Sequence, residues 1–462
     1  GSAEQAFNAR FESIDAVLLM HGVERATEVV NGLLREAKST QQRVDALTAH
    51  ANTRLLAAEH SAGIAAAREA YELAQQLDSP WPRFEAARLL AVGLSQSERA
   101  SEALPLIEPF RELIEREGPV EQRMKFWSDY AYVLNSARRL RRTADALVRA
   151  IETARMAGDF GEQATLTSNY ANTLGNLGRV TEALEQAQRA RALQMQLGDT
   201  GGPAGGAIDM YIGMHSAALG RYRDALVSLD AAVDCFVPGG QIVWIAVANN
   251  HRAALLLDLG QVGRAQKALE YASPPIESVQ ARREVLTGRI ERLQGRDGAS
   301  QISQALALLG KKGDPWMRML AQLEHAPTLP PEQAVARCEA VQRTAEELEY
   351  LGIAAKAHVA RARHLLRQGE THRAVSVLRE APRHLRGVQP TDMYRAEAWW
   401  IEFEVFNAAG DHVDATTSLA SAVDWINTVA LPNVPDEFSD SFLNRNPINR
   451  AILTTASRRL QH

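Results

Sequence analysis

The fold is decided by one stretch of the chain, Ser168-Asn-Tyr-Ala-Asn-Thr-Leu-Gly-Asn-Leu-Gly-Arg-Val-Thr-Glu-Ala-Leu-Glu-Gln-Ala-Gln-Arg-Ala190. Gly178 marks the end of a first helix, because glycine adopts the left-handed conformation just past a helix end without a Cβ penalty. Ala183 follows five residues later and Ala190 seven residues after that, where a second helix would cross the first so closely that only a methyl group fits. Leu184 fills the seam at helical spacing. The stretch therefore predicts two helices joined by a tight turn.

The same glycine-to-alanine offset recurs along the chain, which indicates a repeat. Four more copies keep both offsets: Gly220/Ala225/Ala232, Gly260/Ala265/Ala272, Gly369/Ala374/Ala381 and Gly410/Ala415/Ala422. We call the first alanine of each copy, five residues after the turn, the rung alanine. Weaker copies place further rung alanines at Ala26, Ala66, Ala103, Ala146, Ala305 and one of Ala336 or Ala340. Successive rungs from Ala26 to Ala305 are 37 to 43 residues apart. The sequence therefore predicts an all-α solenoid of about eleven helix pairs.

Prolines agree with this division, because proline ends or kinks a helix. Most fall between the expected pairs, whereas Pro105 and Pro109 fall inside an expected second helix, where we expect a kink or a late helix start. The stretch from 295 to 350 is irregular, and its repeat boundaries stay open. We expect three parts: a cloning remnant at residues 1–2, the repeat region at 3–430, and a non-repeat segment at 431–462 that caps the last repeat.

The repeat resembles the tetratricopeptide family, through the Tyr-Ala…Gly…Ala…Ala spacing that begins at Tyr170. The resemblance implies a right-handed superhelix whose first helices line the concave surface. A second resemblance lies in the stretch Leu431-Pro-Asn-Val-Pro-Asp-Glu-Phe-Ser-Asp-Ser-Phe-Leu-Asn-Arg-Asn-Pro-Ile-Asn-Arg-Ala-Ile, which is similar to the ending of bacterial multidomain regulators such as the maltose-regulon activator type. In those proteins a DNA-binding or cyclase module and a signal-transduction ATPase precede a tetratricopeptide sensor. This resemblance implies that the chain is the sensor arm, with ATP binding and output activity outside it.

Composition and motifs argue against several other functions. The net charge of −5 and the pI near 6.2 disfavour a nucleic-acid-binding surface over the whole chain. The sequence has no G-x-x-x-x-G-K-[ST], H-E-x-x-H or C-x-x-C motif, and its 12 histidines are scattered, so we expect no catalytic residue, no metal and no cofactor. No run of 18 apolar residues is present, which favours a cytoplasmic protein without a membrane partner.

Ligand-binding residues are expected on the concave surface, at fixed positions of each first helix in the family pattern. Those positions hold Asn52, Ser128, Tyr132, Asn135, Ser168, Asn172, Asn176, Met210, Met214, Asn250, Arg363, Trp400 and Glu404. Carboxamides suit an extended peptide backbone because they donate and accept hydrogen bonds at once, and Met210 and Met214 would supply an adaptable apolar patch. The alternative is that these positions hold polar residues only because they face solvent.

The sequence thus favours a non-catalytic, ligand-sensing and protein-interaction domain of a cytoplasmic bacterial regulator in signal transduction and transcription regulation. The expected partner is a protein or peptide, with a small-molecule inducer as a further candidate, and no nucleic acid is expected to bind this region directly. A freestanding tetratricopeptide adaptor is the alternative. An enzyme that uses the groove as a scaffold has no motif in its support. The identity of the ligand and the oligomeric state stay open.

Overall fold

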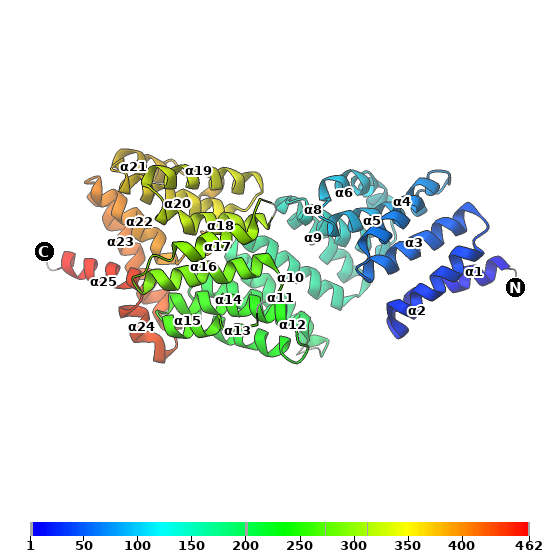
Figure 1. Cartoon of the computed structure of the whole chain (residues 1–462), viewed down its shortest axis with the longest axis horizontal. Coiled ribbons are helices and arrows are strands. Elements are labelled where there is room, and N and C mark those ends of the chain that lie inside the picture. Colours follow the sequence, from blue (N-terminus) through cyan, green and yellow to red (C-terminus); the bar gives the residue numbers. More distant parts are fainter. Residues whose placement is uncertain (1–2, 199–201, 273, 312, 461–462) are drawn as a thin grey trace. The chain divides into compact units, whose positions relative to one another are not determined.

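The computed structural model describes residues 3–198, 202–272, 274–311 and 313–460, and all regular elements in these ranges are helices (Figure 1). Residues 1–2, which we expect to be a cloning remnant, lie outside the described residues. The chain divides into two compact units, Gly1–Asp159 and Phe160–His462. None of the described helices has the length and apolar character needed to cross a membrane.

The first unit consists of antiparallel helices that pair in chain order. They are α1 (Ala3–Glu12), α2 (Ile14–Glu36), α3 (Thr40–Leu56), α4 (His60–Ala74), α5 (Pro80–Gln96), α6 (Ala100–Ile107), the short 3-10 helix η1 (Glu108–Phe110), α7 (Arg111–Glu117), α8 (Val120–Ser136) and α9 (Leu140–Ala157). Pro105 lies inside α6 and Pro109 inside η1. The expected interruption is present, because the second helix of this pair is divided into α6, η1 and α7.

The second unit continues the pairing and ends in a segment of short helices. Its elements are α10 (Phe160–Asn176), α11 (Val180–Gln196), α12 (Pro203–Ala218), α13 (Tyr222–Phe236), α14 (Ile242–Asp258), α15 (Val262–Ala268), α16 (Glu277–Leu293), α17 (Ala299–Leu309), α18 (Pro315–His325), η2 (Ala326–Thr328), α19 (Pro331–Glu347), α20 (Leu351–Arg367), α21 (Thr371–Arg379), η3 (Arg383–Leu385), α22 (Arg395–Ala408), α23 (His412–Asp424), the π-helical η4 (Trp425–Ala430), η5 (Leu431–Asn433), η6 (Asp436–Phe438), α24 (Ser439–Asn444) and α25 (Pro447–Leu460). The pairs from α1/α2 to α22/α23 agree with the predicted number of about eleven.

Tight turns join the two helices within each of the five strongest repeats, as predicted. Their turn glycines all have positive φ, between 71° and 84°: Gly178, Gly220, Gly260, Gly369 and Gly410. The rung alanines five residues later are completely buried at 0% exposure: Ala183, Ala225, Ala265, Ala374 and Ala415. The glycine and the first alanine of the predicted register are therefore confirmed in these five pairs. The second alanine is buried in three of them, at Ala190, Ala232 and Ala422. The prediction is wrong for Ala272 and Ala381, because α15 ends at Ala268 and α21 at Arg379, and Ala272 is exposed.

The predicted register is wrong in three of the weaker pairs. In the second pair the turn residue with positive φ is Ala58, so the residue five positions later is Gly63 and not Ala66. Gly63 makes the close approach, because a Cβ there would lie 2.7 Å from Leu55 Cγ on the facing helix. Because this turn has no glycine, the sequence pattern does not show where the turn lies, and Ala66 was predicted at the position that Gly63 holds.

The same error affects the fourth and ninth pairs. Thr143 follows the fourth turn by five residues and is 1% exposed, so it takes the place predicted for Ala146. In α19 the completely buried alanines are Ala334 and Ala345, whereas Ala336 and Ala340 are exposed. The turn before α19 is the 3-10 helix η2, which does not keep the offset seen elsewhere.

Residues 386–394, which we call the crossing segment, link η3 to α22; residues 386 and 387 are exposed, 388–393 are partly buried and Tyr394 is buried. The Gln389 side-chain amide donates to the carbonyl of Ala218 at the end of α12. The Thr391 N–H donates to the carbonyl of Gly352 at the start of α20, with N···O at 3.0 Å. The crossing segment therefore contacts helix pairs that lie far from it in sequence.

The tail, residues 431–460, docks onto the middle of the second unit. The Ser441 hydroxyl donates to the carbonyl of Leu259 at 2.7 Å, and the Asn446 side chain donates to the carbonyl of Asp258 at 2.8 Å. Accordingly, α24 lies beside α15 (Figure 1). Since α25 also packs against α22 and α23, the tail joins the last pair to the α14/α15 turn.

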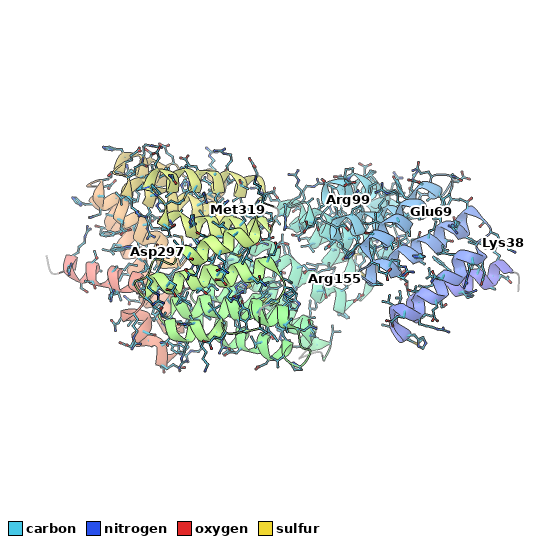
Figure 2. All side chains as sticks on the ribbon, in the orientation of Figure 1. Lys38, Glu69, Arg99, Arg155, Asp297 and Met319 are labelled. Atoms are coloured by element: carbon cyan, nitrogen blue, oxygen red, sulfur yellow. The ribbon has the colours of Figure 1, made fainter. Side chains whose placement is uncertain are left out.

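The tail shares one apolar core with the helices that it joins. The rings of Tyr222 on α13 and Phe442 on α24 lie 5.7 Å apart, and both side chains are almost fully buried. Tyr394, Trp425 and Ile452 belong to the same core. Side chains fill the spaces between the ribbons (Figure 2). This core holds the tail against α13, and the crossing segment lies against the first helices of the unit.

Candidate ligand cavity in the second unit

First helices of five consecutive pairs and the crossing segment surround a cavity of about 160 Å³. The helices are α10, α12, α14, α16 and α18. Its polar and aromatic lining consists of Asn172, Asn176, His215, His251, Asp258, Arg282, Arg289, Trp316, Thr391, Asp392 and Tyr394. The cavity therefore lies on the surface that the repeat register assigns to ligand binding, but the chain's own crossing segment forms one of its walls.

The lining follows the repeat register closely. In three consecutive pairs, the residues six and two positions before the turn glycine face the cavity: Asn172 and Asn176, Met214 and Ala218, Ala254 and Asp258. These positions lie one helical turn apart, so they point the same way from each first helix. Three predicted residues, Asn172, Asn176 and Met214, are brought together here.

A second set of predicted residues is buried instead, and the structure corrects those predictions. Ser168, Met210 and Asn250 lie ten residues before the turn glycines and are 6%, 2% and 1% exposed. The Asn250 amide donates to the carbonyl of Val279 at 3.3 Å, and its oxygen accepts from Tyr271 at 2.9 Å. This position is thus used for packing between neighbouring pairs and is not available as groove surface.

The other predicted residues lie elsewhere. Arg363 donates to Glu397 at 2.7 Å and lines a second cavity of about 380 Å³. Glu404 lies 3.8 Å from Arg363, and Trp400 is stacked on Phe403 with ring centroids 5.0 Å apart. Four more belong to helices of the first unit: Asn52, Ser128, Tyr132 and Asn135.

A buried ion network fixes the crossing segment beside the cavity. Asp392 accepts from both Nη atoms of Arg282, one of them at 2.9 Å. Arg289 donates to Glu324 at 2.6 Å and also pairs with Asp392, while Lys356 donates to Glu324 at 2.9 Å. Burial alone would raise the pKa of Asp392, but the three cations outweigh it and hold that pKa below its ordinary value. The positive charges at this wall are therefore already paired.

Three titratable cavity residues were not predicted from the sequence. Burial lowers the pKa of His215 to about 4, and burial together with the Arg282 charge lowers that of His251 to about 3. Burial raises the pKa of Asp258 to about 7. At neutral pH both imidazoles are uncharged. Counting two residues back from Gly260 would have found Asp258, but nothing in the sequence distinguishes these two histidines from the other ten.

The lining of the cavity combines polar and apolar side chains. Its neutral imidazoles and carboxamides both donate and accept hydrogen bonds, and Trp316 and Met214 add apolar surface. Among the described residues, no three His, Cys, Asp or Glu side chains are placed to hold a metal ion.

Comparisons with known proteins give no assignment beyond this. No family model matches the chain, and no curated protein matches it. One matching solved structure is described as "Crystal structure of APC/C hetero-tetramer Cut9-Hcn1"; it shares 10% identity over 98% of each chain, with a TM-score of 0.34. A similarity this low indicates no shared role. The fold class rests on the helices themselves, which form an all-α solenoid of tetratricopeptide-like pairs.

Proposed function

We propose that the chain is a non-catalytic recognition domain whose second unit senses a small molecule, as the sensor arm of a bacterial regulator. The observation that carries this proposal is the cavity between the first helices and the crossing segment. Ligand pockets are concave, with a few polar groups converging from apolar walls. Asn172, His251 and Met214 provide that combination from three different pairs.

The position of the cavity provides a route from ligand binding to a change elsewhere in the unit. One wall is the crossing segment, whose Asp392 pairs with Arg282 on α16. The neighbouring Tyr394 donates to Asn449 of the tail at 2.7 Å. A ligand that binds one arrangement of these elements more tightly than another shifts the population toward it. Occupancy would thus alter how firmly the crossing segment and tail are held.

The regulator part of the proposal is supported by the resemblance of the tail to the endings of multidomain regulators. Ser441, Asn446 and Asn449 all belong to that stretch, and each makes a hydrogen bond that joins the tail to the rest of the unit. A sequencing test is direct: the reading frame upstream of Ala3 should encode an ATPase or a DNA-binding module. A frame that encodes neither would remove the regulator context but leave the cavity proposal intact.

The sensing part is tested by thermal unfolding of the full chain against a metabolite library. A ligand of the cavity should raise the unfolding temperature, because binding to the native state alone stabilises it. The double variant Asn172→Ala, Asn176→Ala should lose that shift. Asn52→Ala is the matched control, since Asn52 lies six residues before the turn residue Ala58 in the first unit. A shift that persists unchanged in the double variant would place the site elsewhere.

A protein-binding adaptor is the second candidate, and one observation favours it. Tyr132 on α8 lies six residues before the turn residue Arg138 and is 42% exposed, as expected of a side chain available to a partner. Exposed tyrosine is common at binding surfaces because it buries a large area with little loss of side-chain entropy. Selection from a peptide display library, followed by Tyr132→Ala, tests this. Peptides that bind the variant equally well would exclude this surface.

A further inference from the structure

The inference concerns the chemical class of the ligand, and it rests on the proposed sensing function. Five polar side chains of the cavity make no hydrogen bond or ion pair with another described residue: Asn172, Asn176, His215, His251 and Asp258. His215 is 6% exposed, and its Nε2 atom is buried without a partner. Buried polar groups without partners are costly. The other four side chains are partly exposed and line the same cavity, so the hydrogen-bonding groups of all five converge where a bound molecule could contact them.

Arg282, Arg289 and Asp392, by contrast, already have ion-pair partners within the protein. Arg282 holds Asp392 through two Nη atoms, and Arg289 is divided between Glu324 and Asp392. An anionic ligand would have to displace the Asp392 carboxylate from this network, at the cost of a buried charge without its partner. The available hydrogen-bonding capacity therefore lies with the carboxamides, the imidazoles and Asp258.

The protonation states of these open groups favour an uncharged partner. His215 and His251 are neutral at pH 7, because burial lowers their pKa values to about 4 and about 3. Asp258 has a pKa raised by burial to about 7, so it exists partly as a carboxylic acid. A neutral imidazole, a carboxamide and a carboxylic acid each donate and accept hydrogen bonds. A hydroxyl group has the same dual capacity and matches all of them.

We propose that this cavity binds an uncharged small molecule that carries several hydroxyl groups. Its volume of about 160 Å³ sets the size. A cavity of about 150 Å³ accommodates a benzene molecule, so the ligand has about four to six carbon atoms. Trp316, Met214 and Leu255 offer apolar surface for its carbon skeleton. The class is thus a small polyol.

Isothermal titration calorimetry of the full chain tests the class with matched probes. The uncharged probes are erythritol, xylitol and myo-inositol, and xylonate is the charged counterpart of xylitol with nearly the same size. We expect saturable binding of at least one uncharged polyol and none of xylonate. Binding of xylonate alone, or an absence of saturable heat with every polyol, would overturn the inference.

Variants place the binding in the cavity. Asn172→Leu should weaken polyol binding by about tenfold or more, because it removes a hydrogen-bonding group and fills space. Asp258→Asn keeps a group that donates and accepts, so binding should stay within about threefold. Asn52→Leu in the first unit, six residues before the turn residue Ala58, is the matched control and should change nothing. Equal binding by wild type and Asn172→Leu would contradict the proposed position.

The outcomes also separate this inference from the sensing function. A hit from the metabolite library that lacks hydroxyl groups and depends on Asn172 and Asn176 would contradict the polyol class and leave the sensing function standing. A polyol that binds with no dependence on these residues would contradict both. Circular dichroism of each variant confirms that the helices are intact, so loss of binding is not mistaken for loss of fold.

Discussion

The turns of the two units show opposite solutions to the same backbone requirement. In the second, third and fourth pairs, which belong to the first unit, the positive-φ residues of the turns within the pairs carry side chains, with φ of 59°, 60° and 57°: Ala58, Glu98 and Arg138. The corresponding residues in the first three pairs of the second unit are glycines, with φ of 75°, 80° and 71°: Gly178, Gly220 and Gly260. Left-handed geometry alone therefore does not demand glycine in this fold.

The difference follows from what lies against the turns. A Cβ on Gly178 would collide with Val388 of the crossing segment, and a Cβ on Gly220 would lie 2.8 Å from Trp425 Cζ2. By contrast, a Cβ on Gly369 or Gly410 would meet no atom within 4 Å. Some turn glycines are therefore needed only because the backbone has a positive φ. The glycines of three consecutive pairs, Gly178, Gly220 and Gly260, also leave room for another part of the chain to pack against the turn.

Gly260→Ala should have the largest effect on this comparison. A Cβ at residue 260 would collide with the Ser441 carbonyl oxygen and lie 3.1 Å from Asn446 N, and backbone yields less readily than a side chain. We expect a loss of about 3–5 kcal/mol from left-handed strain and overpacking together. Scanning calorimetry of the second unit's transition measures it. Gly410→Ala, the control, should lose only about 1–2 kcal/mol; equal losses would show that the approach of the tail costs nothing.

Gly220→Ala should come next. The new methyl group would press on the Trp425 ring, which is 8% exposed and packs edge-on against Tyr394 with centroids 5.6 Å apart. The ring can shift slightly, so we expect a loss of about 2–4 kcal/mol in the same transition. The pair Gly220→Ala and Trp425→Leu in a double-mutant cycle would measure the contact. Strict additivity of the two changes would mean that Trp425 does not resist the methyl group.

A pH dependence confined to the second unit should be smaller. The folded pKa of Asp258, about 7, lies above the unfolded value near 3.9, so the native state binds its proton more tightly. Stability from this group is therefore lost as the pH rises from about 4 to 7. Between pH 5 and pH 8, wild type should lose about 2–3 kcal/mol more than Asp258→Asn. Parallel pH curves for the two proteins would contradict the raised pKa.

Ala58→Gly in the first unit should have the smallest effect, and the opposite sign. It relieves left-handed strain in the folded state but gives the unfolded chain more freedom. The net gain should be roughly 0.5–1 kcal/mol in the first unit's transition. Chemical denaturation followed by circular dichroism checks this. A loss of stability would mean that the Ala58 side chain makes a contact that matters.

The repeat could be predicted because the residues that specify each helix pair lie close together in the sequence. A glycine that ends one helix and an alanine five residues later are set by the geometry of one turn, so Gly178 and Ala183 predict a pair without knowledge of the rest. The failures at Ala66 and Ala146 have the same origin, since the turns at Ala58 and Arg138 lack the glycine that sets the count.

The residues of the candidate site could be predicted only where they hold fixed positions of the repeat, six and two residues before the turn glycine. Asn172 and Asn176 were found because they hold repeat positions, and Asp258 holds one too. The pairing of Asp392 with Arg282 joins residues 110 positions apart. No local pattern specifies such a pair, and the sequence of the crossing segment, which forms one wall of the cavity, has no periodicity that would reveal it.

The closure of the second unit has a consequence for how the chain folds. Repeat arrays ordinarily fold quickly, because each unit contacts only its neighbours and the contact order is low. Here the Asn446 side chain reaches the carbonyl of Asp258 across 188 residues, and Ser441 reaches Leu259 across 182. During synthesis, α14 and α15 are made long before the residues that cover their turn. The second unit should therefore mature in a late, slow step that the first unit does not share.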